Sequence, residues 1–139
     1  MSGAKVLIVE DEFLVALQLE DILLDCGYEV LGTVPDFGSL AQIVGAPQVA
    51  LVDVNLRDGL TGPDVARALS RSHGSRVIYV TANPNQIDVP ADSAVGIIEK
   101  PFSHETIEAA VAYALADDLS VPRPAELLEL PGYSLRRSA

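Results

Sequence analysis

Residues 5–11 read Lys5-Val6-Leu7-Ile8-Val9-Glu10-Asp11, so an apolar run ends abruptly at two acidic residues. Three later apolar runs also end at a polar residue: residues 49–52 at Asp53, residues 77–80 at Thr81, and residues 95–99 at Lys100. Short runs rich in Val and Ile, separated by helix-like segments, indicate buried parallel strands. The carboxyl ends of such strands form the ligand crevice of an open sheet. The pattern therefore predicts one site with three carboxylates, a hydroxyl and an ammonium group, a combination typical of magnesium-assisted phosphoryl chemistry.

The length and composition indicate one globular domain outside any membrane. A chain of 139 residues can bury roughly two thirds of its unfolded surface. Its hydrophobic fraction is 49%, but no apolar stretch approaches the ~20 residues that span a bilayer. The lone cysteine, Cys26, cannot supply a disulfide framework, and the N-terminus lacks the features of a signal peptide. We therefore expect a cytoplasmic protein.

The negative charge argues against nucleic-acid partners. The formal net charge is −11, and only 9 Lys and Arg residues are spread along the chain. Proteins that bind a phosphate backbone do so with clusters of Lys and Arg, which this sequence lacks. We expect neither a nucleic-acid nor a membrane partner.

Strand and helix signals alternate along the rest of the chain. A further strand is expected at residues 28–33, and helices are expected at residues 13–26, 37–44, 63–72 and, after an N-cap at Ser103, up to residue 117. Pro84 and Pro90 interrupt the interval before the last strand, so any helix there is short or irregular. Right-handed crossovers turn this βαβαβαβαβα order into an α/β doubly wound three-layer sandwich with a parallel sheet of order 2-1-3-4-5.

Four motifs in this order resemble the receiver domain of bacterial response regulators, of the stand-alone, single-domain type. They are Val6 to Glu12, Asp53, Thr81-Ala82 and Lys100-Pro101-Phe102. The resemblance covers about residues 4–117 and implies a flavodoxin-like (βα)5 receiver over residues 1–117. It implies a protein that accepts a phosphoryl group from a sensor histidine kinase or phosphotransfer protein, and then signals through protein contacts or acts as a phosphate sink. No enzyme activity is expected beyond its own phosphorylation and dephosphorylation.

The resemblance also implies a role for each residue of the predicted site. Asp53 would be the phosphoacceptor, whose carboxylate attacks a phosphohistidine. Thr81 and Lys100 would contact the transferred group. Mg²⁺ would offset the mutual repulsion of three packed carboxylates. Its ligands would be Glu10, Asp11, Asp53 and the main-chain carbonyl of Asn55.

Some positions depart from the usual receiver pattern. Ile97 stands where an aromatic residue often reports phosphorylation, so the usual switch cannot operate in its common form. The interval from Thr81 to Lys100 is slightly short and broken by prolines, so we expect a remodelled output face. Residues 79–82 partly resemble a motif of stand-alone alphaproteobacterial receivers. The bond between Lys100 and Pro101 is cis in the family, and we expect it here.

The predicted first helix carries two apolar stripes. One is expected to face the sheet: Val15, Leu19, Ile22, Leu23 and Cys26. Leu14, Leu17 and Leu24 form a second stripe beside it. Receivers meet the helical bundle of their kinase partly through this helix. We therefore hypothesise that Leu14 and Leu17 contribute to kinase docking.

Residues 118–139 do not resemble an output domain. Three prolines break the segment, and it is too short for a DNA-binding helix-turn-helix. Disorder is the default interpretation of such a tail. The alternative is that Leu127, Leu128, Leu130 and Tyr133 dock on an apolar patch of the receiver or of a second subunit.

Three other functions would use some of the same residues. A phosphatase of the haloacid dehalogenase class needs Asp-x-Asp, whereas Asp53 is followed at the second position by Asn55. A mononucleotide-binding protein needs a Gly-rich turn after the first strand, where residues 10–12 would instead repel phosphate. A pseudo-receiver that never takes phosphate and works as a binding module remains the alternative.

Overall fold

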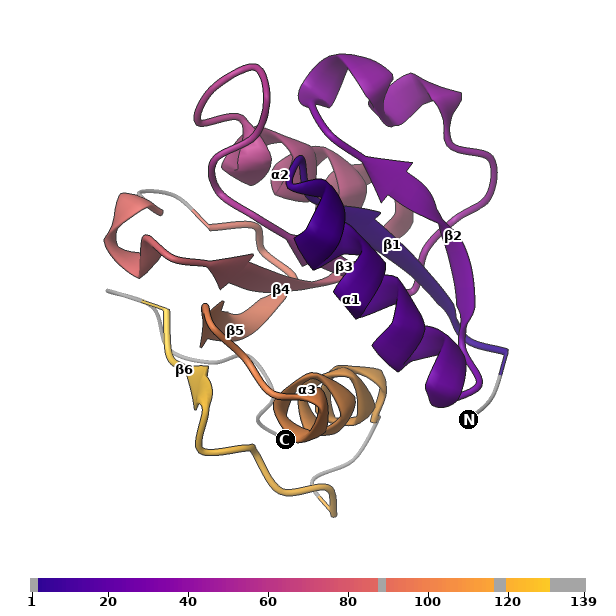
Figure 1. Ribbon diagram of the computed structural model, residues 1–139, viewed down its shortest axis with the longest axis vertical. Coiled ribbons are helices and arrows are strands. Elements are labelled where there is room, and N and C mark those ends of the chain that lie inside the picture. The colour runs from indigo at the N-terminus through magenta and orange to yellow at the C-terminus, as the bar shows by residue number, and fades with distance from the viewer. Residues whose placement is uncertain (1–2, 88–89, 117–119, 131–139) are drawn as a thin grey trace.

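The fold is built on one sheet of six strands in the order β2-β1-β3-β4-β5-β6 (Figure 1). In the computed structural model, which describes residues 3–87, 90–116 and 120–130, the strands are β1 (Lys5–Val9), β2 (Glu29–Val34), β3 (Val49–Val52), β4 (Arg76–Thr81), β5 (Ala94–Glu99) and β6 (Leu127–Leu128). The first five strands are parallel, and β6 runs antiparallel to β5. The predicted order 2-1-3-4-5 is confirmed, and β6 is an addition that the sequence did not predict.

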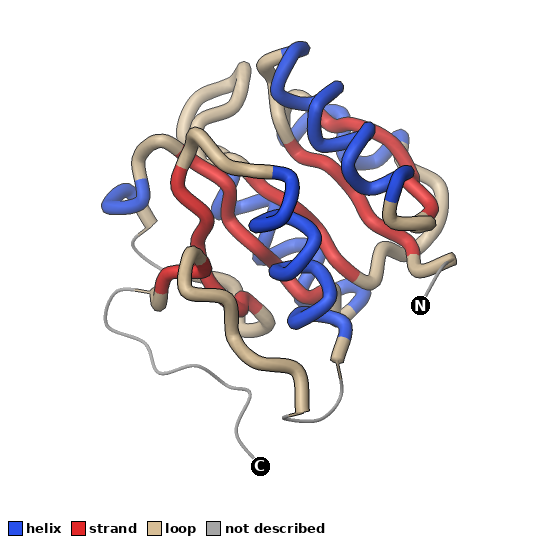
Figure 2. Tube along the Cα trace, turned by 60° about the horizontal axis from the view of Figure 1, so that its bottom comes forward, coloured by secondary structure: helices blue, strands red, loops and turns tan. Residues whose placement is uncertain are grey.

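Helices cover both faces of the sheet (Figures 1 and 2). The helices α1 (Phe13–Asp25) and α3 (His104–Leu115) pack against one face, while α2 (Gly62–His73) packs against the other. Within the described residues, none of these helices has the length and apolarity that crossing a bilayer requires. The three layers of the predicted doubly wound sandwich are therefore present.

The central strand β3 shows how the two layers are joined through the sheet. All four of its residues are buried. Val49 and Leu51 pack with α1 and α3, whereas Ala50 and Val52 pack with α2. Successive side chains of a strand point to opposite faces, so a continuous apolar run satisfies two helical layers at once.

Two of the connections are 3-10 turns rather than α-helices. The predicted helix at 37–44 is a 3-10 helix, η1 (Phe37–Gln42), whose first turn is capped by Asp36 accepting a hydrogen bond from Ser39 N at 2.8 Å. Its six residues end before Gly45 and Pro47, so the segment is too short for a full α-helix. The interval with the prolines holds only η2 (Pro84–Gln86), as expected for a short or irregular element.

Other boundaries differ by a few residues from the predicted ones. The last helix is capped by Ser103, as predicted, but α3 ends at Leu115 and the expected end at residue 117 lies outside the described residues. On α1, Leu19, Ile22 and Leu23 are buried as predicted. The predicted stripe also included Val15 and Cys26, which are only partly buried.

The segment 120–130 packs on the β5 edge of the sheet. Its strand β6 pairs with β5, and Leu127 and Leu130 are buried, whereas Leu128 is exposed. Over the described residues 120–130, the segment therefore lies against the receiver itself. Tyr133 lies outside the described residues.

Candidate functional site

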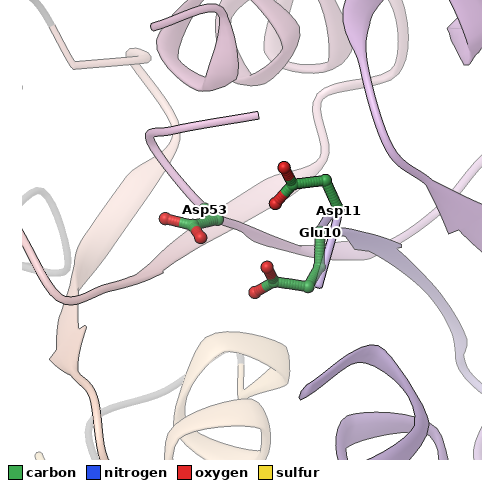
Figure 3. Close-up of side chains that lie close together, drawn as sticks. All are labelled: Glu10, Asp11 and Asp53. Atoms are coloured by element: carbon green, nitrogen blue, oxygen red, sulfur yellow. The ribbon is translucent and has the colours of Figure 1, made fainter. Parts of the chain in front are cut away.

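Three carboxylates gather at the carboxyl ends of β1 and β3 (Figure 3). Glu10 and Asp11 follow β1, and Asp53 follows the neighbouring strand β3. One ligand oxygen from each residue lies within 4.8 Å of the others. Glu10 and Asp53 are buried, while Asp11 is exposed to solvent. The parallel register of β1 with β3 brings these residues together, because both strands end at the same edge of the sheet.

Lys100 supplies the positive charge of this cluster from the end of β5. Its Nζ donates a hydrogen bond of 2.8 Å to Asp53 Oδ2 and lies 2.9 Å from Glu10 Oε1. Its backbone N–H donates to the carbonyl of Thr81 at 3.0 Å, so β5 and β4 are still joined where the lysine leaves the sheet. The following bond to Pro101 is cis, as expected.

The charges of the cluster shift the pKa values of two of its members. Burial raises the pKa of Glu10 from 4.5 to about 7, against the opposing effect of the hydrogen bond from Lys100, and the nearby Asp53 raises it further. Burial would lower the pKa of Lys100, but its hydrogen bonds with Asp53 and Glu10 raise the pKa above its ordinary value. The lysine therefore stays charged, while Glu10 holds its proton up to near neutral pH.

Thr81 ends the neighbouring strand β4, and Asn55 hydrogen-bonds directly to Asp53. Thr81 is fully buried at the end of β4, and its Oγ1 accepts a hydrogen bond from Asn83 N at 3.1 Å. The backbone N–H of Asn55 donates to Asp53 Oδ1 at 3.4 Å. The Asn55 side chain donates to Gln86 Oε1 at 2.8 Å, which links the loop after β3 to η2.

The sequence analysis did not identify two residues that position the site, Gly62 and Gln86. Gly62 begins α2 so close to the acceptor loop that an added Cβ would lie 1.9 Å from the Asp53 carbonyl oxygen. Only glycine allows this approach, in which Gly62 N donates to the Val54 carbonyl at 3.0 Å. Gln86 was missed because its contact with Asn55 depends on the path of an irregular connection. The glycine before Pro63 is the one signal that could have identified the first of them.

The arrangement fits a hard divalent cation. Mg²⁺ prefers oxygen ligands and is usually held by one or two carboxylates together with water and phosphate oxygens. Glu10 Oε1 is buried, and its close charged neighbour among the described residues is Lys100 Nζ at 2.9 Å. A cation among Glu10, Asp11 and Asp53 would offset the desolvation of the buried carboxylates. It would also offset their mutual repulsion.

Ile97 lies away from the cluster, in the middle of β5. It is buried, pairs with Tyr79 of β4 on one side, and is opposite Leu128 of β6 on the other. An aliphatic side chain held between two strands has no aromatic ring to swing toward Thr81. This position of β5 is therefore a buried aliphatic residue of the sheet.

The comparisons with known proteins agree with this geometry. A family model described as the response regulator receiver domain matches residues 6–112. The chain is 30% identical over 117 residues to the phyllosphere-induced regulator PhyR of Methylorubrum extorquens, a match that covers 81% of this chain and 44% of that protein. The solution structure of the PhyR receiver domain of Erythrobacter litoralis has a TM-score of 0.74 at 29% identity, covering 89% of this chain and 96% of that chain.

A longer solved relative is the anti-anti-sigma factor PhyR of Bartonella quintana. It has a TM-score of 0.68 at 25% identity, and the match covers 83% of this chain and 48% of that chain. The chain thus spans about half the length of the two longer regulators, so the likeness extends to one part of each of them.

Proposed function

The chain belongs to the response regulator receiver domain family, and on that premise we propose that Asp53 accepts a phosphoryl group from a phosphohistidine of a sensor histidine kinase or phosphotransfer protein, with Mg²⁺ as the cofactor. The observation that carries the proposal is the position of the Asp53 carboxylate, which lies 2.8 Å from the ammonium of Lys100 and within 4.8 Å of carboxylate oxygens of Glu10 and Asp11. We propose the cytoplasm as the place of action.

The transfer forms one bond and breaks another. A carboxylate oxygen of Asp53 forms a bond to phosphorus while the bond from phosphorus to the histidine nitrogen breaks, and the nitrogen retains the electron pair. Lys100 is placed to follow the charge from the carboxylate to the phosphoryl oxygens, because its ammonium already contacts Asp53. Thr81 would donate its hydroxyl to the phosphoryl group. Mg²⁺, held by Glu10, Asp11, Asp53 and the main-chain carbonyl of Asn55, would neutralise charge on the group in transfer.

Phosphorylation by a small molecule tests this proposal without a kinase. Acetyl phosphate with Mg²⁺ is expected to add one phosphoryl group to the wild-type protein, as measured by intact mass. Asp53→Asn should add none, and omission of Mg²⁺ should prevent the addition. Asp21→Asn, which changes an exposed carboxylate on α1, is the matched control and should behave as wild type.

The same experiment separates the receiver from its alternative. A pseudo-receiver that acts only as a binding module would gain no mass in wild type under any of these conditions. A phosphoryl group that is retained in Asp53→Asn would assign the acceptor to another residue. Either result would overturn the proposal.

An exposed apolar patch on α1 supports docking of the phosphoryl donor. Large hydrophobic side chains of this helix are exposed to 75% at Phe13, 75% at Leu14, 42% at Leu17 and 53% at Leu24. Contiguous exposed apolar side chains mark interaction sites more often than isolated ones do. Because α1 begins directly after Glu10 and Asp11, a helical partner on this patch would lie beside the acceptor. We propose that Leu14 and Leu17 contact the kinase.

A charge placed in the patch tests the docking role. Leu14→Lys should slow phosphotransfer from the kinase at least ~5-fold, since loss of an apolar contact at the centre of an interface costs about 1 kcal/mol or more. Phosphorylation by acetyl phosphate should be unchanged. Val44→Lys alters a side chain that is 86% exposed away from α1 and should leave both reactions unaffected. Equal slowing of both reactions by Leu14→Lys would contradict a docking role.

The phosphorylated state would be read out through protein contacts or would serve as a phosphate sink. The relative described as an anti-anti-sigma factor points to protein contacts, because that name describes binding to another regulator. Only the receiver portion of that relative is matched, so we carry over the class of readout and no specific partner.

A further inference from the structure

The outer edge of β5 has a shape that accepts another strand. Gly96 lies at this edge, and a Cβ added to it would lie 2.7 Å from the Leu128 carbonyl oxygen and 2.8 Å from Leu127 Cγ. Real Cβ atoms are essentially never this close to other atoms, so the added strand could not sit here beside any other residue type. Gly96 has no positive φ that would call for glycine. The absence of its side chain therefore serves the approach of β6.

The segment at this edge inserts one leucine into each helical layer. Leu127 lies opposite Ile98 and joins the core beneath α1 and α3. Leu130 joins the core beneath α2 on the other face. Side chains three residues apart in an extended chain point to opposite faces, so one short segment closes both cores.

A third contact fixes the direction of the segment. Arg123 Nη1 donates a hydrogen bond of 3.0 Å to the carbonyl of Val95, and its guanidinium lies 5.8 Å from the centre of the Tyr113 ring. The segment is thus held at the β5 edge by the contacts of Arg123 at one end and by the buried side chains of Leu127 and Leu130 at the other.

The pairing between β5 and β6 is short enough for another segment to replace β6. Only two pairs of residues are in register between β5 and β6, compared with four or more between each pair of the parallel strands. Leu128 is 41% exposed, and an open groove runs beside it toward Phe102, Ser103 and Thr106 at the start of α3. Without β6, the polar backbone groups of the β5 edge would be open to strand addition.

We propose that the β5 edge is a binding site for an extended segment of a partner protein that carries two leucine-like side chains three residues apart, and that residues 127–130 occupy this site in cis. A partner segment binds there by adding a strand, which supplies main-chain hydrogen bonds, while the places in the two cores that Leu127 and Leu130 occupy select its side chains. The site deepens the protein-contact part of the proposed function and requires no phosphoryl chemistry.

The experiment uses a labelled peptide with the sequence of residues 121–130 and the full chain. The double variant Leu127→Ser/Leu130→Ser lacks both buried leucines of the cis segment. The β5 edge should therefore be free to bind the peptide, while β5 itself is unaltered. Fluorescence anisotropy should show that the peptide binds this double variant at least tenfold more tightly than it binds wild type. A peptide with serine at both leucine positions should not bind.

Gly96→Ala tests whether the peptide binds at the β5 edge. Added to the double variant, it should abolish peptide binding, whereas Gly38→Ala, where the nearest atom to the new Cβ is 3.8 Å away, should leave binding intact. Equal binding to wild type and to the double variant would overturn the proposal, as would binding that survives Gly96→Ala. A folded double variant that binds no peptide would overturn it as well.

A second measurement applies if the double variant does not fold. Excess unlabelled peptide is added to isotope-labelled wild type, and amide exchange at Leu127 and Leu128 is followed. Displacement of β6 should accelerate exchange at these amides, and unchanged exchange would overturn the proposal. Because neither test needs acetyl phosphate or Mg²⁺, failure here would leave the role of Asp53 standing, and failure of the Asp53 test would leave this site standing.

Discussion

The acidic cluster and the β5 edge are built in opposite ways. The cluster at the carboxyl ends of the strands consists of charged groups, whereas the β5 edge consists of apolar side chains packed around a glycine. Lys100 Nζ lies 2.9 Å from Glu10 and 2.8 Å from Asp53, and the two carboxylates repel each other. At the edge, Gly96 makes room for β6, and Leu127 and Leu130 fill the space. The cluster depends on the charge of each side chain. The β5 edge depends on close packing between β5 and β6, which are distant in sequence.

Removal of the Lys100 ammonium from the cluster should have the largest effect on stability. In Lys100→Met the carboxylates of Glu10 and Asp53 stay buried without their partner, and loss of one partner of a buried pair costs about 3 kcal/mol or more. We expect a loss of about 3 kcal/mol in the free energy of unfolding at about pH 8 without Mg²⁺, as measured by urea denaturation.

Mg²⁺ should restore much of this stability, because it supplies positive charge to the same carboxylates. Lys5→Met, at an exposed position, is the matched control and should change stability by less than about 0.5 kcal/mol. A similar small change in Lys100→Met would show that the cluster gains little from the lysine and would break the contrast with the edge.

Displacement of β6 should cost less and should spare the chemistry. Gly96→Ala places a methyl group against Leu128 and Leu127, so the segment leaves and the buried side chains of Leu127 and Leu130 become exposed. Each leucine loses roughly 1.5–3 kcal/mol of burial, partly offset by the regained chain entropy, which gives a net loss of about 2 kcal/mol.

Hydrogen exchange at the amides of residues 127–128 should become fast in Gly96→Ala and stay slow in Gly38→Ala. Phosphorylation of Asp53 by acetyl phosphate should remain within about twofold of wild type, since no atom of the cluster is moved. Loss of phosphorylation together with loss of β6 would mean that the two regions are one cooperative unit.

The pH dependence of Mg²⁺ binding should be the smallest of these effects. The pKa of Glu10 is raised from 4.5 to about 7, so its contribution to the stability of the metal-free fold is complete below 4.5 and is lost as the pH rises through 7. Mg²⁺ needs the ionised carboxylate, so its affinity should rise with pH up to about 7 by at most ~10-fold per unit, and then level off.

Isothermal titration calorimetry between about pH 6 and pH 8 measures this dependence. Glu10→Gln, which has no proton to lose, should bind Mg²⁺ more weakly and with a flatter pH profile. A steep profile that persists in this variant would assign the titration to another group.

The parts of the molecule that depend on local sequence could be predicted. Strand ends are visible as apolar runs that stop at polar residues, so the positions of Glu10, Asp53, Thr81 and Lys100 followed from the alternation of strands and helices. The order of the parallel strands followed from the handedness of the crossovers. The exposed stripe of α1 followed from helical spacing, and Leu14 and Leu17 are indeed exposed.

The parts that depend on packing between distant segments could not be predicted. In the sequence, Gly96 is an ordinary glycine within a strand. The need for glycine is evident only from the structure, in which Leu127 and Leu128 lie against it. Gly62 is tied in the same way to the backbone of Asp53. The roles that the family implies for Asp53, Thr81 and Lys100 remain predictions, because distances alone do not show a phosphoryl transfer.

Chemical mapping of the acceptor tests the central claim most directly. Wild-type protein is phosphorylated with acetyl phosphate and Mg²⁺ and then treated with borohydride, which reduces an aspartyl phosphate to homoserine, and the site is located by peptide mass spectrometry. We predict homoserine at position 53 and at no other carboxylate. Reduction at a different position, or at none in a protein that stays folded, would contradict the account.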